Sequence, residues 1–151
     1  MINKKLEVSA IKDGTVIDHI PADHLFMVIK ILRLDGIDKT ITFGTNFESQ
    51  RLGKKAIIKL SDVFFKDIDI NRIALVAPEA KLNIIKDYKV VEKKVVEVPS
   101  EITGIIKCVN PKCITNHERI TTKFVVLDNK DIKLRCHFCE KVTDPENSEA
   151  L

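Results

Sequence analysis

Apolar and polar residues alternate with the two-residue period of β-strands over several short stretches in the first two thirds of the chain. Turn-forming residues, including Lys12-Asp13-Gly14 and Arg51-Leu52-Gly53, separate these stretches. The short turn at 51–53 also predicts that the strands on either side form a hairpin. The strands predicted in this part are 6–10, 15–17, 40–47, 55–60, 82–85 and 88–98.

Two stretches between these strands have apolar residues at helical spacing instead. The first helix is expected to begin near Pro21, which is tolerated in a first turn, and to end at Gly36. Asp67 or Asp69 is the expected cap of the second helix, and Pro78 stops it. The apolar stripes are Leu25, Val28, Ile29 and Leu32 in the first helix and Ile70, Ile73, Ala74 and Ala77 in the second.

The order strand, helix, strand, strand, helix, strand is the pattern of a ferredoxin-like α+β domain, an antiparallel sheet with two helices on one face. A composition break near Pro99-Ser100 divides the chain into domains 1–99 and 100–151. The second part predicts short strands at 102–107, 123–127 and 132–135, and its polar tail 144–151 is expected to fray. A β-rich unit of this size needs a staple in addition to its core.

Four cysteines supply a candidate staple. Cys108 and Cys113 form a C-x4-C pair, and Cys136 and Cys139 form a C-x2-C pair. Two such pairs can converge on one tetrahedral Zn²⁺ as in zinc-ribbon and rubredoxin-like domains. Four thiolates leave no open coordination position, so this spacing predicts one structural zinc per chain and a C-terminal domain that unfolds without it.

Other interpretations of the cysteines remain open at this point. Two disulfides, free thiols, a redox C-x2-C pair and iron in the same cage all use the same residues. A redox motif is disfavoured because no helical pattern follows Cys136. His117 and His137 are near enough in sequence to be ligands, but with four cysteines available they are expected to be turn residues.

Composition and charge narrow the class of protein. The chain has 151 residues, 44% of them hydrophobic, and is too short for a (β/α)₈ barrel or a full dinucleotide-binding enzyme. No apolar run approaches the roughly 18 to 20 residues of a membrane span and residues 1–5 begin no signal peptide, so we expect a soluble, cytoplasmic protein. Residues 1–99 hold 17 Lys and Arg against 14 Asp and Glu, whereas residues 100–151 hold 8 against 8. This neutral second part argues against a zinc ribbon that binds nucleic acid, which is the main alternative function.

The segment before the first predicted helix contains an unusual Asp18-His19 pair. A helix N-terminus attracts anions, and a histidine there can hydrogen-bond a phosphate. Taken alone, however, such a pair is more typical of a helix cap beside a surface residue. No glycine-rich phosphate-binding motif is present elsewhere in the sequence.

Taken together, these segments resemble the regulatory chain of aspartate carbamoyltransferase, a component of pyrimidine biosynthesis. The resemblance covers nearly all 151 residues in order, and the cysteine cluster combined with A-I-K-x-G-T-V-I-D-H-I-P makes it highly specific. The residues that carry it are LEVSAIKDGTVIDHIP (6–21), TITFGTN (40–46), 57–59, ALVAP (74–78), NIIKDYKVV (83–91) and the C-x4-C/C-x2-C-E-K cluster.

The resemblance implies a chain without catalysis of its own. It implies a regulatory dimer formed through the N-terminal domain, a zinc domain that contacts the catalytic chain, and nucleotide effectors such as CTP, ATP and UTP. The charge balance and the lack of a long apolar run predict no nucleic-acid or membrane partner. Ser9 and Lys81 depart from the family pattern, in which their positions can carry a carboxylate and a hydroxyl.

The resemblance also implies roles for individual residues. Asp18 and His19 would contact ribose and phosphate. Lys59 would contact the base or ribose, and Lys93 would contact the triphosphate. Lys5 would reach a phosphate or a second nucleotide, and Asn83 would line the wall. The apolar and main-chain frame around the base would be Ala10, Ile11, Tyr88 and Val90.

Overall fold

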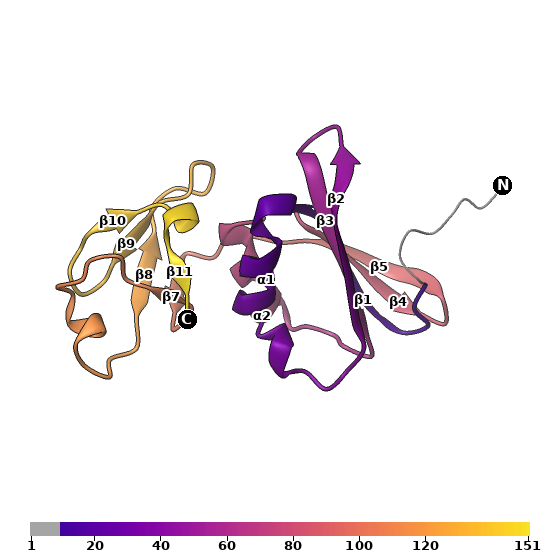
Figure 1. Cartoon of the computed structure of the whole chain (residues 1–151), viewed down its shortest axis with the longest axis horizontal. Coiled ribbons are helices and arrows are strands. Elements are labelled where there is room, and N and C mark those ends of the chain that lie inside the picture. Colours follow the sequence, from indigo (N-terminus) through magenta and orange to yellow (C-terminus); the bar gives the residue numbers. More distant parts are fainter. Residues whose placement is uncertain (1–9) are drawn as a thin grey trace.

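The computed structural model of the chain describes residues 10–151 and has two lobes (Figure 1). The first lobe contains a five-stranded sheet with helices packed on one face, and the second is a smaller unit of short strands and loops. Within residues 10–151, none of the helices has the length and apolar run that a membrane span needs. The chain is therefore α+β, with a ferredoxin-like first lobe, as the sequence predicts.

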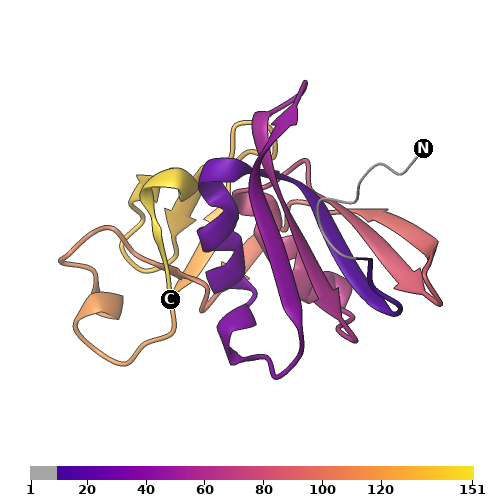
Figure 2. The same cartoon turned by 45° about the vertical axis from the view of Figure 1, so that its right-hand side comes forward.

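The sheet of the first lobe is antiparallel throughout and has the order β2-β3-β1-β4-β5. Strand β1 lies in the centre, and the two hairpins flank it on opposite sides (Figure 2). The first four strands in this order give the ferredoxin-like arrangement, and β5 extends it by one edge strand. The strands are β1 (Gly14–Pro21), β2 (Ile41–Ser49), β3 (Gly53–Ser61), β4 (Lys81–Lys86) and β5 (Lys89–Val95). The strand predicted at 6–10 lies outside the described residues.

The helices are shorter than predicted. A 3₁₀ turn, Ala22–His24, leads into α1 (Leu25–Ile31), and α2 (Asp67–Ile70) continues as the 3₁₀ helix Asn71–Leu75. The prediction that Asp67 or Asp69 caps the second helix is wrong: Lys66 occupies the N-cap position, and no side chain hydrogen-bonds there. Both aspartates lie in the first turn instead, where their negative charges interact favourably with the positive end of the helix dipole.

The strand register places alternate residues on the two faces of the sheet. Ile17, Ile58 and Leu82 are buried against the helices. Their neighbours along the strands point to the opposite face, which no helix of residues 10–151 covers (Figure 1). On that uncovered face, one line of directly paired residues crosses all five strands: Thr42, Lys59, Val16, Asn83 and Lys93. The sheet thus brings side chains from distant parts of the sequence together.

The second lobe is built from six short strands. Its four-stranded sheet has the order β10-β9-β8-β6, and β7 pairs separately with β11. The strands are β6 (Glu101–Thr103), β7 (Ile106–Lys107), β8 (Lys123–Val126), β9 (Leu134–Cys136), β10 (Val142–Thr143) and β11 (Glu149–Ala150). Phe124 and Leu134 fill its interior. A single strand at 102–107 was predicted, but Gly104 at φ 70° turns the backbone and sends its two halves to different sheets.

The expectation that the tail 144–151 frays is also wrong. Ala150 is buried, the Ser148 hydroxyl donates to Asp144 O at 3.0 Å, and Leu151 N donates to Ile105 O at 2.8 Å. Strand β11 also lies against α1 of the first lobe. The buried apolar residues of both lobes therefore form one continuous cluster. The polar composition of the tail does not predict this order, because the tail is held by backbone hydrogen bonds and by one small apolar side chain.

Candidate functional sites

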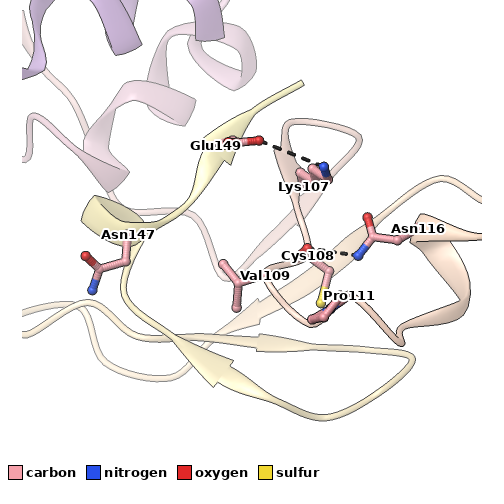
Figure 3. A pocket seen from close by; sticks show the side chains of 7 residues that line it. All are labelled: Lys107, Cys108, Val109, Pro111, Asn116, Asn147 and Glu149. Carbon is pink, nitrogen blue, oxygen red and sulfur yellow. Dashed lines mark hydrogen bonds and ion pairs between the residues drawn. The ribbon is translucent and has the colours of Figure 1, made fainter.

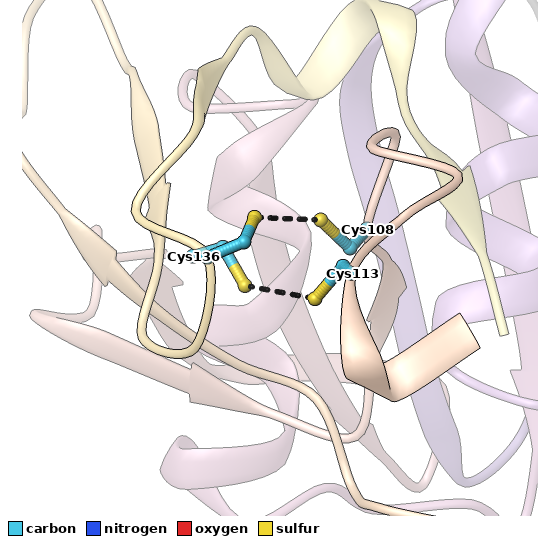
Figure 4. A group of neighbouring side chains, drawn as sticks. Cys108, Cys113 and Cys136 are labelled. Atoms are coloured by element: carbon cyan, nitrogen blue, oxygen red, sulfur yellow. Dashed lines mark hydrogen bonds between the residues drawn. The ribbon is translucent and has the colours of Figure 1, made fainter. Parts of the chain in front are cut away.

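The four cysteines converge at one point in the second lobe, as their spacing predicts. All are free, and their sulfur atoms all lie within 4.8 Å of one another. Cys108 Sγ is 3.6 Å from Cys139 Sγ, and Cys113 Sγ is 3.8 Å from Cys136 Sγ, so each pair joins the two loops (Figure 4). These separations are far longer than a disulfide bond of about 2.05 Å. The arrangement is that of a metal cage.

Side chains of the first loop hold its two cysteines in place. Asn116 Nδ2 donates to Cys108 O at 3.0 Å and to Asn110 O at 2.7 Å, which ties the loop into a compact turn. The Thr115 hydroxyl lies 3.2 Å from Cys113 Sγ. Such outer contacts orient ligands and adjust their basicity. His117 and His137 are not part of the cluster, in agreement with their prediction as turn residues.

Three of the four thiols are buried, and burial disfavours the charged thiolate form unless a cation is bound between them. Burial raises the pKa of Cys108 to about 12 and also raises that of Cys136. At Cys139, burial acts in the same direction, but hydrogen bonds from Asn110 and the Lys141 backbone outweigh it and lower the pKa to about 7. A bound divalent cation supplies the positive charge that thiolates in this environment need.

A cavity of about 380 Å³ opens beside the cysteine loop (Figure 3). One wall is the loop that carries Cys108 and Cys113, and the other is the C-terminal tail. The Lys107–Glu149 ion pair at 4.0 Å links the two walls. The residues lining it are Lys107, Cys108, Val109, Pro111, Asn116, Asn147 and Glu149. The outer surface of the metal loop is therefore open to a partner, while the sulfur atoms face inward.

A second cavity, of about 390 Å³, lies in the first lobe at the ends of β1, β4 and β5. It brings together four of the residues predicted from the sequence: Asp18, His19, Asn83 and Lys93. Lys59 lies on the uncovered face in the line that includes Asn83 and Lys93, and burial lowers the pKa of its ammonium group. The cavity also includes Lys81, Lys94 and Val95, which the sequence analysis did not assign.

The Asp18-His19 pair occupies an irregular point in β1. The register of β1 against β3 shifts between Ile17 and Ile20, and His19 has a left-handed backbone with φ 62°. His19 N donates to Asp18 Oδ1 at 2.6 Å, and Lys55 Nζ lies 3.0 Å from the same oxygen. This bulge turns the histidine toward the cavity edge. The pair is therefore built into the strand and does not cap the helix, since the N-caps of that turn and of α1 are Pro21 and His24.

The remaining predicted residues lie elsewhere. Tyr88 N donates to Lys12 O at 2.9 Å, so the β4–β5 turn meets the segment that contains Ala10 and Ile11. Val90 pairs with Ile85 near this turn. These four residues do not line the cavity at Asp18, and they occupy the opposite end of β4 and β5. Lys5 lies outside the described residues.

Sequence reasoning missed Lys55, Lys81 and Lys94 because their relevance depends on strand register. Alternation along β4 could have placed Lys81 on the face of Asn83, but no local signal indicates that β1 lies beside them. Lys94 faces the opposite side, since its register partner is the buried Leu82. Its ammonium group accordingly pairs with Asp67 at 3.1 Å.

Comparison with known proteins matches both lobes. The family model described as "aspartate carbamoyltransferase regulatory chain, allosteric domain" covers residues 6–97, and that of the "metal binding domain" covers residues 100–149. The regulatory chain of Phocaeicola vulgatus is 56% identical over 146 residues, which are 97% of this chain and 94% of the relative. That of Porphyromonas gingivalis is 49% identical over 151 residues and covers all of both chains. That of Pyrococcus abyssi is 51% identical over 144 residues, which are 94% and 95% of the two chains.

Proposed function

The chain belongs to the family of aspartate carbamoyltransferase regulatory chains, and on this basis we propose that residues 1–99 bind nucleotide effectors while residues 100–151 bind zinc and contact a catalytic chain. A regulatory chain carries no catalysis of its own. Such a chain acts through an equilibrium between two states of the assembly. An effector shifts this equilibrium only by the difference between its binding free energies for the two states, typically about 1 to 3 kcal/mol. CTP, ATP and UTP are the proposed effectors in the control of pyrimidine biosynthesis.

The observation that carries the nucleotide proposal is the cluster on the bare face of the sheet. His19 and Lys93 line one cavity with Asp18 and Asn83, and Lys59 lies in the same cross-strand line. A triphosphate brings about three to four negative charges, and ammonium groups form charge-assisted hydrogen bonds with it. We assign phosphate contact to His19 and Lys93, ribose contact to Asp18, and base or ribose contact to Lys59.

The other end of β4 and β5 supplies a frame for the base. Ala10 and Ile11 precede β1 and, because Tyr88 N bonds to Lys12 O, they lie beside the β4–β5 turn with Tyr88 and Val90. A nucleotide lying along the strands would place its base there and its phosphates at His19. Asn83 lies between the two ends, and Lys5 is proposed to reach a phosphate or a second nucleotide.

Zinc fits the cysteine cage. Zn–S bonds of about 2.3 Å in a tetrahedron require sulfur atoms about 3.8 Å apart. The pairs at 3.6 and 3.8 Å meet this requirement with little movement. Cys108, Cys113, Cys136 and Cys139 would hold one ion with no open position, so the metal would supply structural rigidity. The loop that it organises borders the cavity of Figure 3, which we assign to the catalytic-chain contact.

A second copy of the chain is the other proposed partner. Strand β2 is an edge of the sheet, and Phe43 on it meets Phe26 of α1 edge-on, with ring centroids 6.0 Å apart. Phe26 is 70% exposed and Phe43 is 46% exposed. Adjacent exposed aromatic rings beside an unpaired strand edge favour association. We therefore place the regulatory dimer contact on α1 and β2.

Two measurements on the purified chain test the proposal. Affinity capture from its source should recover an aspartate carbamoyltransferase catalytic chain, and calorimetric titration with CTP or ATP should show binding that His19→Ala and Lys93→Ala weaken. The matched control is Lys66→Ala, an exposed lysine outside both cavities. Salt-sensitive retention of nucleic acid without nucleotide binding would contradict the proposal and favour a zinc-ribbon nucleic-acid protein.

A further inference from the structure

A third cavity lies where the two lobes meet, and it belongs to neither the nucleotide site nor the metal site. Its volume is about 450 Å³. The first lobe contributes the end of α1 and residues in and around α2, and the second lobe contributes the turn between β6 and β7. We propose that this cavity binds a small organic carboxylate with an apolar body, which bridges the two lobes. The inference goes beyond the proposed function and does not depend on it.

The charged lining of this cavity carries a net positive charge, because it consists of Arg33, Arg72 and Asp69. Arg72 Nη1 lies 3.7 Å from Asp69 Oδ1, a distance that allows an ion pair but is too long for a good hydrogen bond. Within residues 10–151, the guanidinium group of Arg33 has neither an ion-pair partner nor a hydrogen bond. Most N–H donors of the two guanidinium groups are therefore available to an acceptor from outside the chain.

The backbone holds Arg33 in a fixed conformation just beyond the end of α1. Its φ is 55°, in the left-handed region. Arg33 N donates to Lys30 O at 3.1 Å, and Arg33 O accepts from Gly36 N at 3.2 Å. Because this backbone is already ordered, less conformational entropy is lost when a ligand binds to the side chain.

Much of the remaining wall is apolar. Ile31 and Ile105 are buried, and Leu32 and Phe65 are half-buried. A guanidinium group binds a carboxylate through two parallel hydrogen bonds, while an apolar wall favours a ligand with a hydrocarbon part. Small-molecule pockets have volumes of about 300 to 1,000 Å³ and are frequent at domain interfaces. The lining therefore favours an organic carboxylate over an inorganic anion, which would leave the apolar wall without contacts.

Nuclear magnetic resonance titration of the full chain with 4-phenylbutyrate tests the inference. The probe should shift the backbone amide signals of both lobes, at residues 31–33, 69–72 and 103–105, and the shifts should saturate. Two matched probes separate charge from apolar contact: 4-phenylbutyramide keeps the shape without the charge, and acetate keeps the charge without the apolar body. Each should bind at least about tenfold more weakly than 4-phenylbutyrate.

Substitution of the two arginines locates the site. Arg33→Gln and Arg72→Gln should each weaken binding of 4-phenylbutyrate by about five- to tenfold, as expected for the loss of one charge-assisted contact. Arg119→Gln is the matched control, because Arg119 is exposed, has no acidic partner in the described part of the chain and lines none of the three cavities. An unchanged urea midpoint confirms that the variants fold.

Four results would overturn the inference. They are the absence of a saturable shift, shifts confined to one lobe, equal affinity for the acid and the amide, and wild-type affinity in either arginine variant. Displacement of the probe by ATP without shifts at residues 103–105 would place the probe in the nucleotide site and would also overturn it. Titration with CTP or ATP tests the proposed function separately, so either claim can fail while the other stands.

Discussion

Lys94 of β5 reaches across to α2, where its Nζ lies 3.1 Å from Asp67 Oδ1. The preceding residue, Lys93, points to the opposite face of the sheet and lines the proposed phosphate site. A second tie lies close by, since Glu97 N donates to Asn71 Oδ1 at 3.0 Å. One edge strand thus faces the proposed site with one residue and contacts the helix layer with the next.

The Lys94–Asp67 pair should make a small, pH-dependent contribution to stability. The hydrogen bond and charge of Asp67 raise the pKa of Lys94 above its ordinary value of 10.5. A raised lysine pKa means that the folded state binds this proton more tightly than the unfolded state. The stabilisation is therefore fully present below pH 10.5 and is lost as the pH rises through the raised value. Asp67→Asn should lower the urea midpoint at pH 8, and the difference from wild type should close above pH 10.5.

Asp69→Asn is the matched control for this pH dependence. Asp69 lies 3.7 Å from Arg72 on the same helical segment. An arginine stays protonated throughout this range, so any effect of Asp69→Asn should be constant with pH. Parallel pH profiles for the two variants would contradict the role assigned to Lys94.

Metal removal should unfold the second lobe selectively. Structural zinc sites contribute roughly 10 to 16 kcal/mol of apparent binding energy, which exceeds what the small core around Phe124 and Leu134 can supply. A strong chelator should therefore expose residues 100–151 to limited proteolysis and abolish binding of the catalytic chain. Metal content is measured on the same samples.

Substitution of one cysteine tests the same prediction without a chelator. Cys136→Ser removes a fully buried ligand and should reproduce the effect of the chelator. Thr121→Ser, a change of one methyl group in the same lobe, should leave both metal content and protease resistance unchanged. A metal-free chain that remains protease-resistant and still binds its partner would show that the cage is not what holds the lobe together.

Gly14→Ala should be strongly destabilising. A Cβ at Gly14 would lie 2.0 Å from Leu60 O, and the residue has φ 145°, a backbone conformation that side chains disfavour. Because Gly14 pairs with both neighbouring strands, the clash cannot be relieved without disturbing the centre of the sheet. We expect a loss of about 2 to 4 kcal/mol in the free energy of unfolding, measured by urea denaturation. Gly36→Ala, where an added Cβ meets nothing within 4 Å, is the control.

Phe26→Ser should weaken the proposed regulatory dimer without unfolding the chain. The side chain is 70% exposed, so its loss removes little from the core of one chain while removing an aromatic anchor from the contact. Light scattering coupled to size exclusion should show a shift from dimer toward monomer. Phe64→Ser, at an exposed aromatic residue whose ring centroid lies 5.5 Å from Lys86 Nζ at the end of β4, should leave the mass unchanged. If Phe26→Ser also keeps the wild-type mass, the contact is not on this face.

The sequence predicted the features that depend on local pattern. Alternation and helical spacing indicated the strands and helices around β1, and the cysteine spacing indicated the metal cage. Features that depend on long-range pairing were missed. The turn at Gly104 and the ordered tail both arise from pairing between β7 and β11, which are separated by about forty residues.

The candidate site shows the same division. Asp18 and His19 stand out locally, and family resemblance added Asn83 and Lys93. Lys81 lies opposite Asp18 on the neighbouring strand, and this pairing cannot be predicted from the local sequence around either residue. The short α2 has a related cause, since the continuation from Asn71 tightens into a 3₁₀ helix that the apolar stripe alone does not reveal.

The sheet is covered on one side only, and no segment of residues 10–151 closes over the other. A nucleotide on that face would lie on the sheet, and no part of residues 10–151 would separate it from water on its other side. Exchange would then be governed by the strength of the contacts themselves. The occupancy of such a site would depend on the current concentrations of competing nucleotides and would not depend on earlier ones.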